Sequence, residues 1–516
     1  MLRSSFPLLS SIARRQAASK AIGGLNRIPL DEPLPGFEKT SASTSNASAA
    51  SNADPFEAQL TTLDSGLKIA TQPCHGDFVT IGVAIASGSR YEAEYTKGIS
   101  HFLEKLAFAS STRRSSEEIF AALDKSSAIV DCQSTRDTTI YAASCHRSGV
   151  AEILEMIADA AIRPALLEEE IQAASQTIQH ENADLAMRIE GIEPLLTDYL
   201  HQAAFQHNTL GFSKFTPDAA LQLLKRDEVI RFQRAHHVPN RMVVAGVGVD
   251  HEEFVAFAQR SFVANTDIPN GTRPVDRSVA QYTGGEKRVS KDLSRVGAGT
   301  PYPLLAHVSV GFQGVGYKDE DFVAFCVLQS LLGGGNSFSA GGPGKGMYTR
   351  LYTDVLNYYH WMYGCQAFNH SYADAGVVAI QSGVPPEGVG AAVQIITHQF
   401  LRLAEGAEKD ELERAKTQLK SQLLMNLELR PVMFEDIVRQ VIGHGYRKKP
   451  DEYMKRIESI SADDVVRVGQ RILNSRPTLV GYGDISKLPS YEQLDEAVAR
   501  RDATLLAEKK KLFSFK

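Results

Sequence analysis

Apolar and polar residues follow regular periods from about Phe56 onward. Alternation with a period of two predicts strands, and apolar residues three and four positions apart predict helices. The strands are predicted at 79–86, 129–133, 138–144 and 242–249, and the helices at 99–108, 150–162, 166–187 and 252–262. The capping box Ser115-Ser116-Glu117-Glu118 opens a further helix. Strands and helices are therefore mixed through the first half of the chain.

The second half of the chain repeats the pattern of the first. Residues 307–317 echo residues 79–90, which begin with the predicted strand at 79–86, and a helix is predicted to follow at 321–332. Residues 478–484 likewise echo 243–250, near the end of the first half. A repeat of this length predicts two homologous domains.

Domain boundaries follow from the segments without a period. Residues 266–303 are rich in Gly, Pro, Asp and Ser, so we expect a linker there. The expected fold class is α+β, with mixed α/β-sandwich domains at 56–265 and 304–516.

The N-terminal segment has the composition of a targeting signal. Residues 1–30 contain five basic residues and no acidic one, as mitochondrial transit peptides do. Residues 31–55 are rich in Ser, Ala and Asn and predict a flexible tether.

The net charge and the cysteine content limit the classes of function that are expected for this chain. The chain has 55 basic and 61 acidic residues, a net charge of −6, and loses five of the basic ones with the leader. An acidic body suits a basic partner and argues against nucleic-acid binding. Five scattered cysteines predict free thiols, and no apolar run is long enough to predict a transmembrane segment.

The stretch His101-Phe-Leu-Glu-Lys105 is one residue away from the zinc motif H-x-x-E-H. In that motif two histidines four residues apart hold zinc, and the glutamate activates water. Here Lys105 replaces the second histidine, and an ammonium with a pKa near about 10.4 has no lone pair for a metal. A self-sufficient protease is therefore excluded.

A glycine-rich stretch at 333–346 predicts a long loop. Its glycines cannot belong to the interior of a helix or strand, where each costs up to about 1 kcal/mol. It is not a phosphate-binding loop, because Ser339 stands at the first glycine and Gly346 at the hydroxyl residue of that motif. Glycines interleaved with Phe338 suit a mobile flap over an extended peptide.

Three segments together carry a resemblance to a known family. They are the degenerate motif, the glycine-rich loop with Met347-Tyr-Thr-Arg-Leu-Tyr352, and Leu427-Glu-Leu-Arg-Pro-Val-Met-Phe-Glu-Asp436. From about Ile28 to the C-terminus the chain resembles the alpha subunits of the mitochondrial processing peptidase family, noncatalytic members of the pitrilysin-like inverted zincins. Asn336 departs from the pattern, because a fourth glycine is expected there.

The resemblance implies a noncatalytic chain that recognises substrate. It would hold no metal or cofactor and would pair with a beta subunit that carries zinc, in the mitochondrial matrix or peripheral to the inner membrane. The implied substrates are arginine-rich presequences of imported precursors. The implied substrate-binding residues are Gly333, Gly334, Gly335, Asn336, Ser337, Phe338, Ser339, Gly341, Gly342, Gly344, Lys345 and Gly346.

The resemblance also places Glu181 at the third ligand position of the active relatives, 76 residues beyond Lys105. Two possibilities remain for the degenerate motif. His101, Glu104 and Glu181 could form a weak metal site, or Lys105 could form an ion pair with Glu104 or Glu181, which we favour. The alternative function is that of a structural core subunit of ubiquinol-cytochrome c reductase, which would have no need of a flap.

Overall fold

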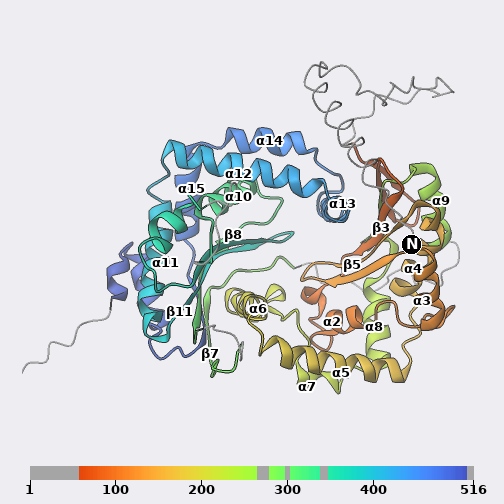
Figure 1. Ribbon diagram of the computed structural model, residues 1–516, viewed down its shortest axis with the longest axis horizontal. Helices are drawn as coiled ribbons and strands as arrows, with labels where there is room; N and C mark the ends of the chain where they lie inside the picture. Colours follow the sequence, from red (N-terminus) through yellow and green to blue (C-terminus); the bar gives the residue numbers. More distant parts are fainter. Residues whose placement is uncertain (1–56, 264–277, 297–302, 337–346, 508–516) are drawn as a thin grey trace, which may run out of the picture. The chain divides into compact units, whose positions relative to one another are not determined.

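The computed structural model describes residues 57–263, 278–296, 303–336 and 347–507 (Figure 1). The expected transit peptide, 1–30, and the tether, 31–55, lie outside the described residues and remain predictions. Residues 55–516 form one compact unit. Two six-stranded mixed sheets, one from each half of the chain, organise this unit.

The first sheet belongs to the N-terminal half. Its order is β1 (Gln59–Thr62), β2 (Lys68–Gln72), β6 (Met242–Val247), β3 (Phe78–Ile85), β5 (Thr139–His146) and β4 (Ile129–Ser134). Only β2 and β6 run parallel, and the other neighbours are antiparallel. Three of these strands, β2, β3 and β6, are almost wholly buried, which explains the nearly continuous apolar character of β3 and β6.

The second sheet repeats five strands of this order, with β7-β12-β8-β11-β10 corresponding to β2-β6-β3-β5-β4. Its order is β7 (Gly285–Ser290), β12 (Thr478–Gly483), β8 (Ala306–Gly314), β11 (Gly376–Val384), β10 (Gly364–Ser371) and β9 (Gly334–Asn336). Again one pair, β7 and β12, runs parallel while the others are antiparallel. The repeat predicted from the sequence, and the α+β fold with it, is confirmed.

Helices of the same half cover one face of each sheet. On the first sheet these are α4 (Val150–Ile162) and α9 (His251–Phe262), with α3 (Ser116–Lys125) nearby (Figure 1). On the second sheet they include α10 (Phe322–Leu332), α11 (Val389–Leu403) and α15 (Ala462–Leu473). The bounds of α4 are those predicted from its apolar period.

The opposite face of each sheet is covered by a helix of the other half. From the N-terminal half, α6 (Ile192–Ala204) packs on β7, β8 and β12. From the C-terminal half, α13 (Arg430–His444) packs on β2, β3 and β6. We call this arrangement the helix exchange, and it makes each half depend on the other for its core.

Seven further helices complete the described fold, and α2, α5 and α12 among them line the two candidate sites. They are α2 (Ile99–Lys105), α5 (Glu168–Leu185), α7 (Asp218–Leu221), α8 (Arg226–His236), α12 (Lys409–Leu427), α14 (Pro450–Ser459) and α16 (Tyr491–Ala499). No helix of the described residues has the length and apolar character needed to cross a bilayer.

The structure differs in detail from two expectations. The segment 266–303, expected to be a linker because it lacks an apolar period, contains β7, which pairs with β12. This strand lies at the edge of the sheet and is rich in charge, so no apolar period marks it. Gly334 and Gly335, expected in a loop, belong to β9 at the opposite edge, where a side chain at Gly334 would collide with the Cys365 carbonyl.

Candidate functional site

The degenerate motif lies on α2, a helix whose start is fixed by a buried carboxylate. Helix α2 follows Gly98, whose φ of 87° is readily adopted by glycine. Glu92 accepts hydrogen bonds from the backbone N–H groups of Gly98 (2.6 Å) and Ser100 (2.9 Å). Burial raises the pKa of Glu92 to about 7, although both N–H groups favour the charged form. The helix that carries His101 and Glu104 is thus held at its N-terminus.

His101 is buried and held by a segment far along the chain. The backbone N–H of Thr216 donates a hydrogen bond to His101 Nδ1 (3.2 Å), and the Phe215 ring meets the imidazole edge-on, with centroids 6.0 Å apart. Burial, reinforced by the positive charges of Lys105 and Lys214, lowers the pKa of His101 to about 4. The imidazole is therefore neutral at physiological pH.

Lys105 contacts both carboxylates of the degenerate motif. Its Nζ lies 2.8 Å from Glu181 Oε2 and 3.6 Å from Glu104 Oε1. The second oxygen of Glu104 accepts a hydrogen bond from the backbone N–H of Ser134 (2.7 Å) in β4. Burial raises the pKa of Glu104, while the Ser134 N–H and the Lys105 charge oppose this rise. Of the two sequence hypotheses, this geometry corresponds to the ion pair.

These side chains line a cavity of about 370 Å³ between α2 and α5. Lys214 lines it as well, and its pKa is lowered by burial and by the nearby Arg136 charge. A catalytic zinc site needs three ligands with free lone pairs, whereas here the Lys105 ammonium contacts the Glu104 and Glu181 carboxylates and leaves one imidazole beside them, with Lys214 as a second positive charge. The residues do not fit zinc, and no group of three metal-ligating side chains is found within the described residues.

The glycine-rich loop begins at the edge of the second sheet. Gly334, Gly335 and Asn336 pair with β10, and the Gly334 N–H donates a hydrogen bond to Thr349 Oγ1 (3.0 Å). Thr349 stands on the far side of the loop, so this bond joins its two ends. The other proposed recognition residues, Ser337, Phe338, Ser339, Gly341, Gly342, Gly344, Lys345 and Gly346, lie outside the described residues.

A buried ion pair anchors the C-terminal end of the loop. The Arg350 guanidinium is almost wholly buried and contacts both oxygens of Glu411 on α12, at 2.8 and 2.7 Å. It also donates to the backbone carbonyl of Gly406 (3.0 Å). Two-pronged contacts of this kind fix orientation as well as distance. The chain on either side of the loop is therefore firmly placed.

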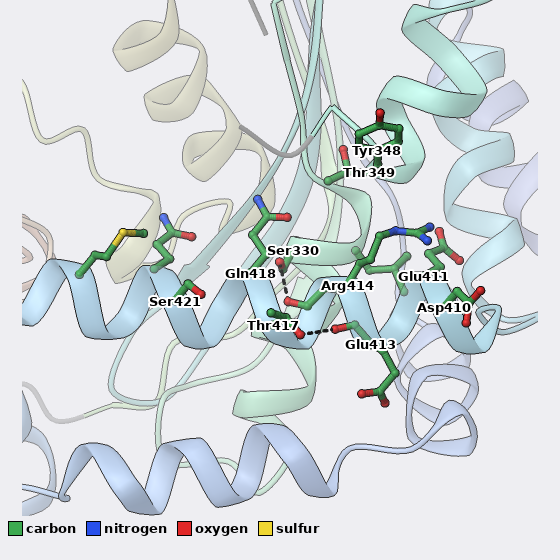
Figure 2. A pocket seen from close by; sticks show the side chains of 14 residues that line it. Ser330, Tyr348, Thr349, Asp410, Glu411, Glu413, Arg414, Thr417, Gln418 and Ser421 are labelled. Carbon is green, nitrogen blue, oxygen red and sulfur yellow. Dashed lines mark hydrogen bonds between the residues drawn. The ribbon is translucent and has the colours of Figure 1, made fainter. Parts of the chain in front are cut away.

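A groove of about 980 Å³ lies where the loop returns to the fold (Figure 2). One stripe of α12 forms its floor, and Tyr348 and Thr349 stand on the opposite side. The floor residues at helical spacing are Asp410, Arg414, Thr417, Ser421 and Met425. Tyr348 and Met425 are both highly exposed, which is unusual for large apolar side chains. The groove offers polar and apolar contacts along one helix.

Sequence reasoning identified α2, Glu181 and the loop but missed the residues that support them. Thr216 and Lys214 belong to no motif and reach the site only through tertiary folding. The Arg350–Glu411 pair joins residues 61 positions apart, which no local pattern connects. The sequence does not indicate that the Glu92 carboxylate is buried, because most glutamates are exposed and no pattern distinguishes this one.

Comparison with known proteins places these features in a family. Residues 68–218 match the family described as insulinase (peptidase family M16), and residues 224–419 match the peptidase M16 inactive domain. A relative from Caenorhabditis elegans named mitochondrial-processing peptidase subunit alpha is 50% identical over 98% of this chain and 99% of its own. The chain belongs to the family of mitochondrial-processing peptidase alpha subunits. The recognition made from the sequence is thereby confirmed.

Other alpha subunits of this family are similar over nearly their whole length. The protein of that name from Bos taurus is 45% identical over 94% of this chain and 92% of its own length. The one from Solanum tuberosum is 32% identical over 91% of this chain and 87% of its own length. The M16 match at 68–218 includes the degenerate motif and Glu181. The match to the inactive domain includes the groove floor as far as residue 419.

Proposed function

We propose that this chain is the noncatalytic, substrate-recognising subunit of a mitochondrial processing peptidase. The observation that carries the proposal is the Lys105 ammonium, which lies 2.8 Å from Glu181 where the second zinc-binding histidine of an active enzyme would stand. A cation in that position repels a metal ion and supplies no ligand. The catalytic zinc and its base would come from a beta subunit in the mitochondrial matrix.

Recognition of presequences is assigned to the glycine-rich loop and the groove beside it. Fixed ends at Gly334 and Arg350 with glycines between them support a segment that closes over a bound peptide. The acidic excess of the chain favours arginine-bearing peptides through long-range attraction.

The test is cleavage of an arginine-bearing presequence peptide by the full chain, by a zinc-loaded beta partner and by their mixture. We expect activity only in the mixture, together with zinc bound to the partner. Deletion of residues 337–346 should raise KM for the peptide at least about tenfold, since binding contacts are lost. A deletion of equal length at 266–275 is the matched control and should leave KM unchanged.

Two outcomes would contradict the proposal. Cleavage by the chain alone would show that Lys105 does not disable the site. No effect of the chain on its partner would instead favour the structural role considered from the sequence.

A further inference from the structure

A further cavity, which we call the interhalf cavity, lies between the two halves of the described unit. Its volume is about 610 Å³. The first half contributes Tyr91, Thr135 and Thr138 among others, and the second half contributes residues of α10, β10, α12, α13 and α14. Pockets for small molecules measure about 300 to 1,000 Å³ and are found preferentially at boundaries of this kind. The size and the place of the interhalf cavity therefore suit a small molecule.

Helix α12 separates the interhalf cavity from the groove. Leu419 and Leu423 line the cavity, whereas Thr417 and Ser421 belong to the groove floor. Each leucine follows a floor residue by two positions, which is about 200° around an α-helix. The cavity and the groove therefore use nearly opposite faces of α12 and are separate sites.

The two carboxylates that line the interhalf cavity are both paired with arginines. Asp137 Oδ1 lies 2.7 Å from Arg90 Nη1. Asp436 Oδ2 accepts a hydrogen bond from Arg447 Nε (2.9 Å). Because each carboxylate already has a guanidinium partner, neither offers an uncompensated negative charge to a bound cation.

The basic side chains of the cavity wall are paired or neutral. Arg439 Nε donates a hydrogen bond to Glu435 Oε1 (2.8 Å). Burial lowers the pKa of His370 to about 4, and burial together with the Lys448 charge lowers the pKa of His444. Both imidazoles are therefore neutral at physiological pH. An ionised ligand would lose its hydration here without gaining an ion pair.

The wall of the interhalf cavity has an apolar part and a polar part. Helices α10, α12 and α14 supply the apolar part, which consists of Phe322, Val323, Leu419, Leu423 and Ile457. The polar part includes Thr135 and Thr138 of the first half and Asn369 and Ser371 at the end of β10. A ligand that fills the cavity therefore needs both an apolar body and a polar group.

Two tyrosine hydroxyls are available to the polar group of such a ligand. Tyr317 and Tyr453 both line the cavity, and neither hydroxyl forms a hydrogen bond with another described residue. Both oxygens are accessible, since neither is a buried atom that lacks a partner. A tyrosine hydroxyl can donate a hydrogen bond and accept one, so it can bind a hydroxyl or a carbonyl group.

We propose that the interhalf cavity binds a neutral amphiphilic small molecule. Its apolar ring or chain would pack against α10, α12 and α14, and its hydroxyl or carbonyl group would bind Tyr317 or Tyr453. The inference goes beyond the proposed function, because recognition of presequences is assigned to the glycine-rich loop and to the groove on the other face of α12.

Calorimetric titration of the full chain with three probes tests the class of ligand. The probes p-hexylphenol, p-hexylbenzoate and p-hexylbenzylamine share one apolar body, and at neutral pH they are neutral, negative and positive. We expect one p-hexylphenol to bind per chain, at least about tenfold more tightly than either ion. Equal or tighter binding of an ion, or no binding of the phenol, would overturn the proposal.

A pair of variants tests the location of the site. Leu423→Trp adds bulk inside the cavity and should weaken binding of p-hexylphenol at least about tenfold. Leu424→Trp is the matched control, because Leu424 is exposed and does not line the cavity, and it should leave binding unchanged. Unchanged binding in Leu423→Trp would overturn the proposal.

Photolabelling of the unaltered chain gives a second measurement that needs no variant. A diazirine analogue of p-hexylphenol should label residues 322–326 or 419–423, as mass spectrometry of the digested chain would show. Labelling confined to other segments would overturn the proposal. None of these readouts uses peptide cleavage, so their failure is distinguishable from failure of the proposed function.

Discussion

The buried Glu92 carboxylate links the stability of the protein to pH. Its pKa in the folded protein is about 7, against an unfolded value of 4.5, because burial disfavours the charge. A raised pKa means that the folded state binds a proton more tightly than the unfolded state. The resulting stabilisation is complete below pH 4.5 and is lost as the pH rises through 7.

Substitution Glu92→Gln should remove this pH dependence. As the pH rises from 5 to 7, we expect the free energy of unfolding of the wild-type chain to decrease relative to that of the variant. The decrease should be roughly 3 kcal/mol at most. Urea unfolding at several pH values measures this difference. The exposed Glu94→Gln serves as control and should run parallel to the wild type. Parallel curves for Glu92→Gln would contradict the assignment.

Single residues were predictable only where a motif fixes their role. The spacing within the motif placed Lys105 and Glu181 at the positions of two zinc ligands. In the structure, Lys105 Nζ lies 2.8 Å from a Glu181 carboxylate oxygen. Thr216 acts through its backbone N–H, which every residue except proline possesses, so no sequence pattern can mark it. Long-range packing decides such contacts.

At the scale of elements, the helix exchange relies on close approach between helix and sheet. Gly82 in β3 and Gly311 in β8 end the echoing stretches Val79-Thr-Ile-Gly and Val308-Ser-Val-Gly. A Cβ atom on Gly82 would lie 2.6 Å from the Phe434 ring of α13, and one on Gly311 would lie 3.0 Å from a Leu200 methyl of α6. Each exchanged helix therefore packs closely against a glycine of the sheet that it covers.

Alanine at these two positions should destabilise the protein to different degrees. For Gly82→Ala we expect a loss of about 1 to 3 kcal/mol, because the new methyl also meets the Tyr141 carbonyl at 2.3 Å. Gly311→Ala should cost less, since its nearest neighbour is the flexible end of Leu200. Urea unfolding of both variants measures the order, and an equal or reversed order would refute this reasoning.

Elements with a strong apolar period were predicted well, and those without one were not. Helix α4 has the predicted bounds, because its apolar stripe is continuous. Strand β7 was missed, since this edge strand contains three consecutive charged residues, Glu286, Lys287 and Arg288. The exchange of α6 and α13 was also missed, because an apolar stripe does not say which sheet it covers.

At the scale of the whole described unit, a buried arginine joins the two halves. Arg90 contacts Asp137 of its own half (2.7 Å) and both oxygens of Asp374 in the other half (2.7 and 3.0 Å). Asp137 in turn accepts a hydrogen bond from the Ala373 backbone N–H (3.1 Å). We call these ion pairs of Arg90 with Asp137 and Asp374 the latch, and they hold the two halves together in addition to apolar packing.

Substitution Asp374→Asn should weaken this latch. Removing the charge leaves Arg90 buried with one carboxylate instead of two, which should cost about 2 kcal/mol or more. Urea unfolding measures the loss, and limited proteolysis should show faster cutting between the halves. Asp124→Asn, at an exposed position on α3, is the control. Unchanged midpoints in both variants would mean that the latch contributes nothing.

The overall plan of two similar sheets was predictable from the internal repeat. The way the halves depend on each other was not, because the sequence echo describes strands within a half and not contacts between halves.

The helix exchange has a consequence for the origin of the chain. A single ancestral repeat would have had one sheet face without a helix to cover it. Two copies of that repeat could cover both faces only by trading helices, as a domain-swapped homodimer does. Gene duplication and fusion would then have made the swap permanent. On that view, the present chain is such a dimer held in one polypeptide, and its halves became free to specialise separately.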